Sequence, residues 1–503
     1  MSEQSLGNKR IAKNTMALYV RMGITMFLSF FTTRITLDIL GFDDFGLNNV
    51  VASVVSMFGF INGSMGTAVQ RFFSIEIGKN NHKLLARVFG TGLYLHLIVA
   101  GITFLLSELF ALFFLSKLNI PPERLLAAHW VFQISIVSLV LNILLVPFQA
   151  LLRAHEAFSK IAMLDVLRAV LKLAVLLLLY RIQYDKLVAL SLLNFGITLI
   201  YISIIILFAR KFEEARFRLL RDKELMSRML RFISMLVFTV LTALLNKQGI
   251  VILVNLFFGL TINAAYAVAF QVSQMLETFA MNFKQAVVPQ LMQSFGAKDF
   301  GRMNKLIFLG TKVTFLLMVL ISIPLIFESE YILKVWLKEV PGHAAMFTVL
   351  IAIGVNVNTF YYFVYQAVHA SGKIRQQQVL SSVSYLLSVA VIYLSFKWGA
   401  GFYYAAIVPI GFGVLRNIIV LKSAATAIGF RVRPYLLKVL VPCFGLVLLL
   451  LLLPALFVLL LDASLGRLLL ILSANTLSAA GLGYYLVLNK EERLVLGQMF
   501  FKK

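Results

Sequence analysis

Long apolar segments separated by short polar loops follow one another along almost the whole chain, from Thr15 to Leu488. A helix needs about 20 apolar residues to cross the roughly 30 Å hydrocarbon core of a bilayer. The pattern predicts about fourteen transmembrane helices, over residues 15–40, 47–73, 86–115, 125–152, 161–180, 187–209, 231–258, 262–291, 306–328, 343–370, 379–397, 402–428, 439–461 and 467–488. No hydrophilic domain interrupts them, so we expect an all-α integral membrane protein.

Composition agrees with this pattern. The 503 residues are 60% hydrophobic and only 14% charged, which is far from the balance of a soluble protein. The polar N-terminus precedes a segment that is too long and too charged for a cleavable signal, so we expect it to be retained. Cys443 is the single cysteine and the six histidines lack metal-ligand spacing. We therefore expect no disulfide, metal or other cofactor.

The net charge of +24 has a topological explanation. Lys and Arg crowd into every second loop, most densely in Arg210 to Arg231, whereas the loops between carry few. The positive-inside rule assigns the basic loops to the cytoplasm, together with both termini. The acidic turn at Gly41 to Gly46 is then external. No basic run is interleaved with stacking aromatics outside the apolar spans, so we expect no nucleic-acid partner.

Short matches at a nearly constant spacing indicate an internal duplication. The matched positions are Gln149 with Gln366, Ala150 with Ala367, Gly41 with Gly259, Gly78 with Gly296, and Arg87 with Lys305. The repeated unit is six helices long, and because six is even, both copies cross the membrane in the same direction. We expect an N-lobe at 1–209 with helices 1–6, a cytoplasmic linker at 210–230, a C-lobe at 231–428 with helices 7–12, and two further helices with a tail at 429–503.

Nine basic residues lie inside the predicted helices, where each costs roughly 3 kcal/mol at the bilayer centre. They are Arg21, Arg34, Arg71, Arg168, Lys172, Lys247, Lys284, Lys312 and Arg416. Four of these cations can reach water from near a cytoplasmic helix end, namely Arg21, Arg71, Lys284 and Lys312. Arg34 and Asp38 are spaced i, i+4, so a structural ion pair explains them as well as a ligand contact. Asp165 can likewise neutralise Arg168 at i+3.

The cations at mid-depth are harder to explain by local pairing. Lys172 follows Arg168 by four residues and adds a second positive charge to the same face. Lys247 and Arg416 have no neutralising neighbour in sequence. Partners from other helices are one explanation, and a hydrated cationic cavity is the other. Such a cavity would select an anionic cargo bearing phosphate or carboxylate, because low-dielectric walls focus the positive field. Arg would hold phosphate bidentately, and Lys would act as a point charge.

Intramembrane carboxylates are the candidates for ion coupling. Glu277 is the deepest, and it could carry a proton or help to bind Na⁺. The alternative is an ion pair with Lys247 or Lys284. Asp38 and Asp165 are the other coupling candidates. The sequence offers no nucleophile and base pair, phosphate-binding glycine loop or metal cluster, so we expect a non-enzymatic protein without catalytic residues.

Arg34 together with the segment from Leu40 to Lys79 resembles bacterial O-antigen and related polysaccharide flippases of the Wzx type. These form the polysaccharide transport family of the multidrug/oligosaccharidyl-lipid/polysaccharide exporter superfamily. The similar elements are the Arg, then LG, D-x-G and Q-R-F, and on this basis Arg34 and Arg71 are assigned to substrate binding. The resemblance also implies a cationic lumen suited to an anionic cargo. This agrees with the physical argument that assigns four more cations to substrate binding, namely Arg168, Lys172, Lys247 and Arg416.

The resemblance implies an inner-membrane flippase that moves undecaprenyl-diphosphate-linked oligosaccharide from the cytoplasmic to the periplasmic leaflet. Two six-helix lobes would enclose a central cavity with alternating access, coupled to H⁺ or Na⁺, and the last two helices would flank the lipid tail. Membrane lipid and the polymerase machinery of O-antigen, lipopolysaccharide, capsule or exopolysaccharide are the implied partners. The alternatives are a peptidoglycan-precursor flippase, a multidrug exporter of the same fold, and a membrane polysaccharide polymerase. A drug exporter should favour acidic cavity residues, and a polymerase should have larger external loops.

Overall fold

A computed structural model describes residues 3–59, 61–114, 122–215, 220–337 and 340–494. Parts of the predicted linker (216–219) and of the predicted C-terminal tail (495–503) lie outside this range. The chain forms two compact units, which we describe separately. The N-terminal unit is Lys13–Ile233, and the C-terminal unit is Ser234–Lys503 together with Met1–Ala12. The start of the first helix is bonded within the C-terminal unit, because Gln290 Nε2 donates to the carbonyl oxygen of Gly7 at 2.6 Å.

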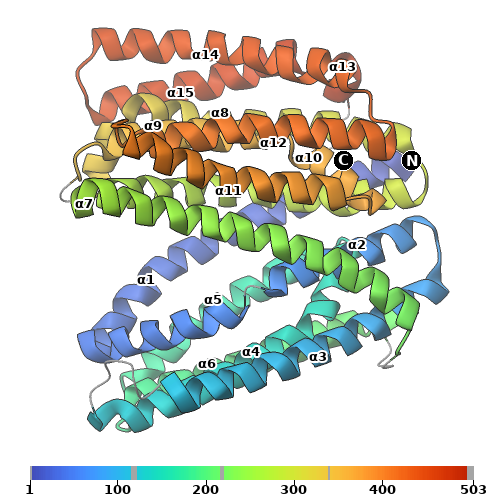
Figure 1. Cartoon of the computed structure of the whole chain (residues 1–503), viewed down its shortest axis with the longest axis vertical. Coiled ribbons are helices and arrows are strands. Elements are labelled where there is room, and N and C mark those ends of the chain that lie inside the picture. Colours follow the sequence, from blue (N-terminus) through green and yellow to red (C-terminus); the bar gives the residue numbers. More distant parts are fainter. Residues whose placement is uncertain (1–2, 60, 115–121, 216–219, 338–339, 495–503) are drawn as a thin grey trace. The chain divides into compact units, whose positions relative to one another are not determined.

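The N-terminal unit is a bundle built around one central helix (Figure 1). Its α-helices are α1 (Glu3–Gly59), α2 (Ile61–Gly78), α3 (His82–Phe114), α4 (Leu125–Ala154), α5 (Phe158–Leu179) and α6 (Lys186–Ala209), with short 3-10 helices η2 (Pro122–Arg124) and η3 (Glu213–Ala215). Helix α4 packs against α2, α3 and α6, and α5 packs against α6. The central position of α4 explains why nearly half of its residues, including Phe132 and Leu151, are buried.

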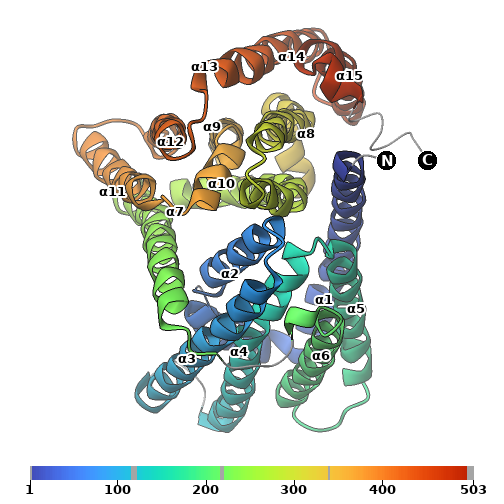
Figure 2. The same ribbon diagram turned by 90° about the vertical axis from the view of Figure 1, so that its right-hand side faces the viewer.

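The C-terminal unit repeats this plan and adds a peripheral helical layer. Its elements are α7 (Lys223–Gly296), α8 (Phe300–Trp336), α9 (Ala344–Thr359), α10 (Tyr362–Ser371), α11 (Arg375–Lys397), α12 (Tyr404–Ile428), α13 (Val432–Tyr435), η4 (Leu436–Leu440), α14 (Val441–Leu460), α15 (Leu465–Leu482) and η5 (Gly483–Val487). Helices α14 and α15 pack against each other and against α8 (Figure 2). They are the two helices predicted after the second repeat.

The all-helical membrane architecture is confirmed, and the described residues contain no strand. Ten described helices are long and apolar enough to cross a membrane, and the bent pair α9 and α10, at 41°, makes an eleventh. Helices α1 and α7 are each two helices joined at a backbone break, at Gly41 and Gly259. If α1 and α7 are each divided at their break, and if α5 is also counted as a span, the described segments follow the fourteen predicted ranges closely.

The duplication is visible in the backbone itself. Gly41 has φ 72° and ψ 177°, and Gly259, 218 positions later, has φ 78° and ψ −174°. Only glycine adopts this region of φ/ψ space without strain. The next loops also match, since Asn80 and Lys298 both take positive φ, at 53° and 58°. The predicted pair of six-helix repeats is therefore confirmed by backbone geometry as well as by sequence.

The hydrogen bonds that close these two loops are equivalent as well. The Asn81 amide donates to the Glu76 carbonyl at 3.0 Å, and the Asp299 amide donates to the Ser294 carbonyl at 2.9 Å. The side chain of Asn81 then accepts from the third residue of its helix, and that of Asp299 accepts from Arg302 in the same way. Asn and Asp are favoured at this position because their side-chain oxygens satisfy a free amide of the first turn.

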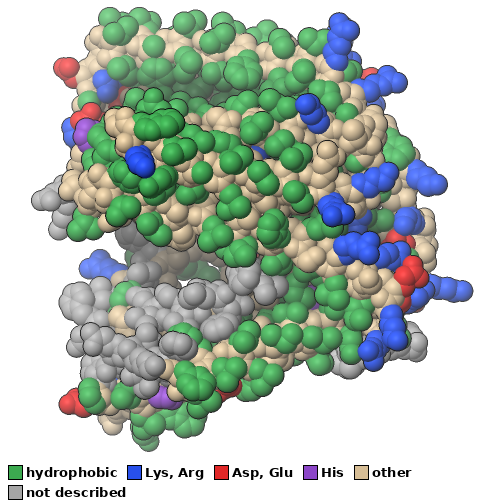
Figure 3. Space-filling view, viewed as in Figure 1, with side chains coloured by type: hydrophobic (Ala, Val, Ile, Leu, Met, Phe, Trp, Pro, Cys, Tyr) green, Lys and Arg blue, Asp and Glu red, His purple; other side chains and the backbone are tan. Residues whose placement is uncertain are grey.

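Apolar side chains cover the outer face of the C-terminal unit over α14 and α11, while Lys and Arg gather toward the end that holds α13 (Figure 3). Leu448, Leu452 and Leu459 on α14 are among the most exposed leucines. Such exposure would be unfavourable in water and is ordinary against lipid tails.

Two buried ion pairs attach the additional helices to α8. The Arg467 guanidinium donates to both carboxylate oxygens of Glu328, at 2.6 and 2.9 Å, and the Glu328 side chain is fully buried. Lys312 Nζ lies 2.7 Å from Glu492 Oε2, with the lysine side chain only 2% exposed. The expectation that Lys312 extends to water is therefore wrong, because the chain beyond η5 supplies its counter-ion.

The break at Gly259 provides a test of the fold. We expect Gly259→Ala to lower the free energy of unfolding by about 1–3 kcal/mol, since alanine is strained at this φ and ψ. Gly411→Ala is the matched control, because Gly411 lies inside α12 and a methyl group added there would meet open space. It should be neutral or stabilising by up to about 1 kcal/mol. Thermal unfolding in detergent measures both, and an equal shift for the two variants would contradict the strain argument.

Candidate functional site

In the N-terminal unit, polar side chains from three helices meet around Asp165 of α5. Arg21 of α1 donates to Asp165 Oδ2 at 2.9 Å, and the Tyr201 hydroxyl of α6 donates to Asp165 Oδ1 at 3.1 Å. The guanidinium carbon of Arg168 lies 5.0 Å from the centre of the Tyr201 ring. The predicted pairing of Asp165 with Arg168 is therefore wrong: Asp165 neutralises Arg21, and Arg168 rests on an aromatic face.

This group carries more positive than negative charge. Lys172 is exposed on α5 and lies close enough to Arg168 for their charges to repel each other. Arg153 of α4 interacts electrostatically with Tyr201, Asp165 and Arg21. The Nε atom of Arg168 is buried and has no hydrogen-bond partner among the described residues. We call Arg21, Arg153, Asp165, Arg168, Lys172 and Tyr201 the N-terminal cationic cluster.

The C-terminal unit has a corresponding arrangement on α11 and α12. The guanidinium carbon of Arg416 lies 4.3 Å from the centre of the Tyr385 ring, and the arginine is only 7% exposed. Its Nη1 atom donates one long hydrogen bond, 3.4 Å, to the Ser384 hydroxyl. Its buried Nε atom has no partner, and no described carboxylate lies within 4 Å of the guanidinium. An aromatic face thus replaces the counter-ion that a buried arginine normally requires.

Two lysines of α7 are arranged in the same way. Lys247 Nζ lies 4.8 Å from the centre of the Phe270 ring, and Lys284 Nζ lies 4.7 Å from that of Tyr362. Glu277, two turns before Lys284, is exposed and interacts with it electrostatically, although no ion pair joins them among the described contacts. The alternative expectation, that Glu277 forms a direct ion pair with Lys247 or Lys284, is not met.

We call six residues of this region the C-terminal cationic cluster: Lys247, Glu277, Lys284, Tyr361, Tyr385 and Arg416. Lys247 belongs to it because the side chain of the preceding residue, Asn246, donates to the Tyr385 carbonyl at 2.8 Å. The charges of both Arg416 and Glu277 act on the Tyr361 hydroxyl, which places them near one another. Nearby, Gln378 Nε2 of α11 donates to the Tyr365 hydroxyl of α10 at 3.2 Å and lies 2.8 Å from Nε2 of His369, also of α10. The region is therefore rich in hydrogen-bonding groups as well as in positive charge.

The two clusters share a geometry in which the partners have exchanged places. In the N-terminal unit the cation, Arg168, is on the fifth helix of the repeat and the ring, Tyr201, is on the sixth. In the C-terminal unit the ring, Tyr385, is on the fifth helix and the cation, Arg416, is on the sixth. At the offset of 217 that relates Gln149 to Gln366, Arg168 corresponds to Tyr385. Both repeats thus place one cation against one ring between the same two helices.

Arg71 is buried, with 7% of its surface exposed. The expectation that it reaches water from near a helix end is therefore wrong. Its guanidinium lies 5.0 Å from the centre of the Phe72 ring and 4.7 Å from that of Phe232. The Glu76 carboxylate, one turn further along α2, acts on it electrostatically.

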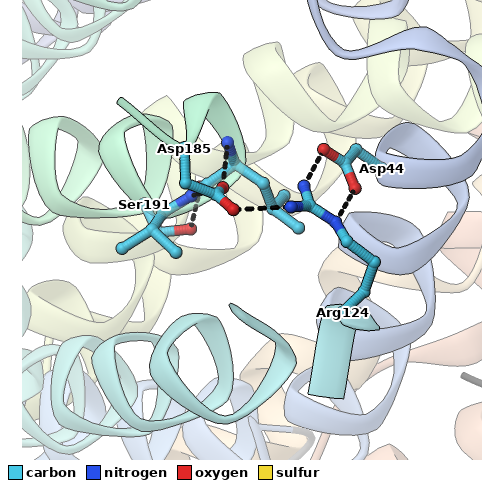
Figure 4. Close-up of polar contacts among 6 residues, drawn as sticks. Asp44, Arg124, Asp185 and Ser191 are labelled. Atoms are coloured by element: carbon cyan, nitrogen blue, oxygen red, sulfur yellow. Dashed lines mark hydrogen bonds and ion pairs between the residues drawn. The ribbon is translucent and has the colours of Figure 1, made fainter. Parts of the chain in front are cut away.

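Arg34 and Asp38 lie apart from the cationic clusters. Both are exposed on α1, and Asp38 accepts a hydrogen bond of 2.8 Å from the Tyr180 hydroxyl instead of pairing with Arg34. The nearby acidic turn is held by Arg124, which donates to Asp44 Oδ1 at 2.8 Å and to Asp185 Oδ2 at 2.6 Å (Figure 4). This network connects the region just after the break in α1 with the starts of α4 and α6, and we assign it a structural role.

Sequence reasoning missed several residues of the clusters. Arg153 is not among the nine cations predicted inside the helices, and Tyr201, Tyr361 and Tyr385 have no sequence signal beyond their occurrence in apolar helices. Gln149 contacts the N-terminal cluster, since its Nε2 lies 3.5 Å from the Tyr201 hydroxyl, but in the sequence Gln149 and Gln366 indicated only the duplication. Among the described residues, no three His, Cys, Asp or Glu side chains are grouped so that they could hold a metal ion.

Two similar helical repeats with intramembrane polar clusters define a membrane transporter of the kind built from parallel repeats. The MatE family model matches residues 19–178 and 232–394, one match in each repeat, and the chain belongs to this family. Its members are transporters, so the chain is a transporter and the alternative of a polysaccharide polymerase is dropped. No curated protein matches the chain.

Solved structures share the fold at low sequence identity. A MATE protein in its straight conformation has a TM-score of 0.72 at 12% identity, covering 84% of this chain and 96% of that chain. The MATE transporter ClbM in complex with Rb⁺ has a TM-score of 0.68 at 12% identity, covering 82% and 94%. A MOP superfamily transporter from Pyrococcus furiosus has a TM-score of 0.69 at 11% identity, covering 84% and 99%. These similarities establish the fold alone.

The contrast between paired and unpaired charges gives a second prediction. Asp165→Asn should destabilise the N-terminal unit by on the order of 1–3 kcal/mol, since it removes the ion pair between Asp165 and Arg21 at a partly exposed site. Arg416→Gln should change stability by less than about 1 kcal/mol, because the lost cation–π contact is offset by removing a buried, unneutralised charge. Thermal unfolding in detergent distinguishes them, and a larger loss for Arg416→Gln would indicate a hidden structural ion pair.

Proposed function

We propose that this MatE-family transporter is a flippase for an undecaprenyl-diphosphate-linked oligosaccharide, used in the synthesis of a surface polysaccharide. The observation that carries the proposal is that Arg168, Lys247 and Arg416 each lie against an aromatic ring, with no described carboxylate within 4 Å. Each of these cations therefore keeps its charge available for an anion. Arg34, Arg71 and Lys172 complete the proposed substrate-binding set.

The balance of charge in the clusters favours an anionic head group over a cationic drug. The N-terminal cluster holds four cations and one carboxylate, and the C-terminal cluster holds three cations and one carboxylate. The negative charge of a diphosphate would attract these cations more strongly than hydrocarbon or aromatic rings do. Its polyprenyl chain could stay in the bilayer, so the protein would need to shield only the head group.

Hydrogen-bonding groups near the cations suit the sugar part of the cargo. Tyr361 and Tyr365 offer hydroxyl groups beside apolar ring faces, which matches the mixed surface of an oligosaccharide. The buried oxygen atoms of Gln366 and Asn358 have no hydrogen-bond partner among the described residues. Water or cargo hydroxyls would satisfy them.

A multidrug exporter is the second candidate, because one of the matched structures is described as a multidrug resistance MATE family transporter in an outward-facing conformation. The matched transporter from Pyrococcus furiosus is described as having a binding pocket of reversed polarity that suggests a different function. The fold does not determine whether the binding groups are mainly positive or mainly negative. The sign of their charge therefore discriminates between the candidates. A peptidoglycan-precursor flippase would use the same diphosphate chemistry and is separated only by its sugar.

We further propose location in the bacterial inner membrane, with both termini cytoplasmic and with the polysaccharide polymerase machinery as a downstream partner. Transport would be coupled to H⁺ or Na⁺ through Glu277. Of the three coupling candidates, Asp165 is tied to Arg21 and Asp38 to Tyr180, whereas Glu277 is exposed and joined to Lys284 only by long-range attraction. Of the three, Glu277 is the one that no described hydrogen bond or ion pair engages.

Neutralising the three unpaired cations tests the proposal. We expect the triple variant Arg168→Gln, Lys247→Gln and Arg416→Gln to reduce flipping of the lipid-linked oligosaccharide in proteoliposomes at least tenfold. The reason is that a hydrogen bond to a charged group contributes about 1.5–3 kcal/mol. Efflux of a lipophilic cation should be unchanged or faster.

The matched control removes the same charge at exposed helix ends, in Lys211→Gln, Lys223→Gln and Lys397→Gln. This control should flip the cargo as well as the original chain. Normal oligosaccharide flipping by the first triple variant would overturn the proposal, and rapid efflux of a lipophilic cation by the original chain would favour the drug-exporter alternative.

The coupling role of Glu277 is tested separately. We expect Glu277→Gln to make flipping insensitive to an imposed pH or Na⁺ gradient, because the amide can neither bind a proton nor provide a charge. Glu330→Gln is the control, since Glu330 is an exposed carboxylate of α8 engaged by Lys334 at 2.8 Å. Retained gradient dependence in Glu277→Gln would exclude this carboxylate from coupling.

A further inference from the structure

The N-terminal unit contains an apolar groove of about 710 Å³ between α3, α4 and α6. Leu93 and Leu97 of α3, Leu144 and Phe148 of α4, and Ile202 of α6 are among the residues that form its walls. Leu97 is 47% exposed, so the groove opens to the surroundings of the unit along α3. Its volume is within the range of pockets that hold small organic ligands.

One end of the groove is cationic. Arg210, the residue that ends α6, lines the groove and is exposed. The chain after Arg210 turns back onto the unit, where Phe212 stacks on His155 with ring centres 4.0 Å apart, and Glu214 Oε1 lies 2.7 Å from His155 Nε2. A second ion pair joins Arg87 to Asp222. The contacts of Phe212 and Glu214 hold the chain that follows Arg210 against this unit.

The groove is separate from the N-terminal cationic cluster. Tyr201 of α6 points to that cluster, whereas Ile202, the next residue, lines the groove. Successive residues of a helix are about 100° apart around its axis, so the two sites use different faces of α6. None of Arg21, Arg168 and Asp165 lines the groove. Its occupant is therefore not the part of a cargo that binds the cluster.

We propose that the groove binds an anionic glycerophospholipid of the cytoplasmic leaflet, with an acyl chain between α3, α4 and α6 and its phosphate at Arg210. Acyl chains match the leucine and isoleucine walls, and a phosphodiester matches the guanidinium at the mouth. Arg210 belongs to the most basic loop of the chain, which is expected to be cytoplasmic, and anionic lipids are attracted to such residues by about 1 kcal/mol each. The bound lipid would fill the groove and hold α3 and α6 against α4.

Photolabelling tests this site in the full chain reconstituted in lipid nanodiscs. The probe is phosphatidylglycerol with a photoactivatable group in one acyl chain, and labelled peptides are identified by mass spectrometry. We expect labels on residues 93–97, 141–148 and 202–206. Arg210→Gln should reduce this labelling about fivefold, as expected for the loss of roughly 1 kcal/mol. Leu144→Trp, which fills the groove, should abolish it.

Lys211→Gln is the matched control, because Lys211 is the adjacent exposed cation and does not line the groove. It should label like the original chain. A phosphatidylcholine probe should lose less labelling in Arg210→Gln, because its choline cation offsets the attraction of its phosphate to the guanidinium. Unchanged phosphatidylglycerol labelling in Arg210→Gln would overturn the proposal even if Leu144→Trp fails to fold. Displacement of the probe by a polyprenyl phosphate, at concentrations where phosphatidylglycerol does not displace it, would also overturn it by assigning the groove to a prenyl chain.

Discussion

Placing a positive charge at bilayer depth requires something to replace water around it, and this requirement organises both units. A carboxylate partner is the usual solution, but it cancels the charge. The face of an aromatic ring is a weaker partner, worth on the order of 0.5–2 kcal/mol, and it leaves the cation without a fixed counter-charge. Arg168 and Arg416 use this second solution, on Tyr201 and Tyr385. The positive field of each unit is therefore preserved for another anion.

Paired charges have a different distribution and a different role. Arg467 with Glu328 and Lys312 with Glu492 attach the start of α15 and the chain beyond η5 to α8, and Arg124 connects segments at the starts of α4 and α6. Breaking such pairs leaves a charge exposed to low dielectric, so they enforce one arrangement of the helix ends. Mid-helix cations on rings impose no such arrangement. Rigid ends and adaptable centres are the combination that a transporter needs if its helices move as bodies while its binding groups accept and release a cargo.

The sequence predicted the architecture well because apolar run length and glycine position are local properties. Gly41 and Gly259 were identified from spacing alone, and both turned out to be backbone breaks. The partners of the buried charges were predicted poorly, because they come from other helices. Asp165 was matched with the nearest cation in sequence, Arg168, whereas tertiary packing gave it Arg21. Periodicity indicates which face of a helix is polar, but not which residue of a neighbouring helix meets that face.

Duplication explains why the two clusters resemble each other without sharing residues. After a gene segment doubles, each copy must solve the same problem of holding a cation between its fifth and sixth helices, but either helix can carry the charge. Arg168 lies on the fifth and Arg416 on the sixth, with a tyrosine opposite each. Such an exchange keeps the charge between the two helices while altering the direction from which it is presented. What the repeats preserve is thus a positive charge at a given depth, and this is the property that an anionic cargo would detect.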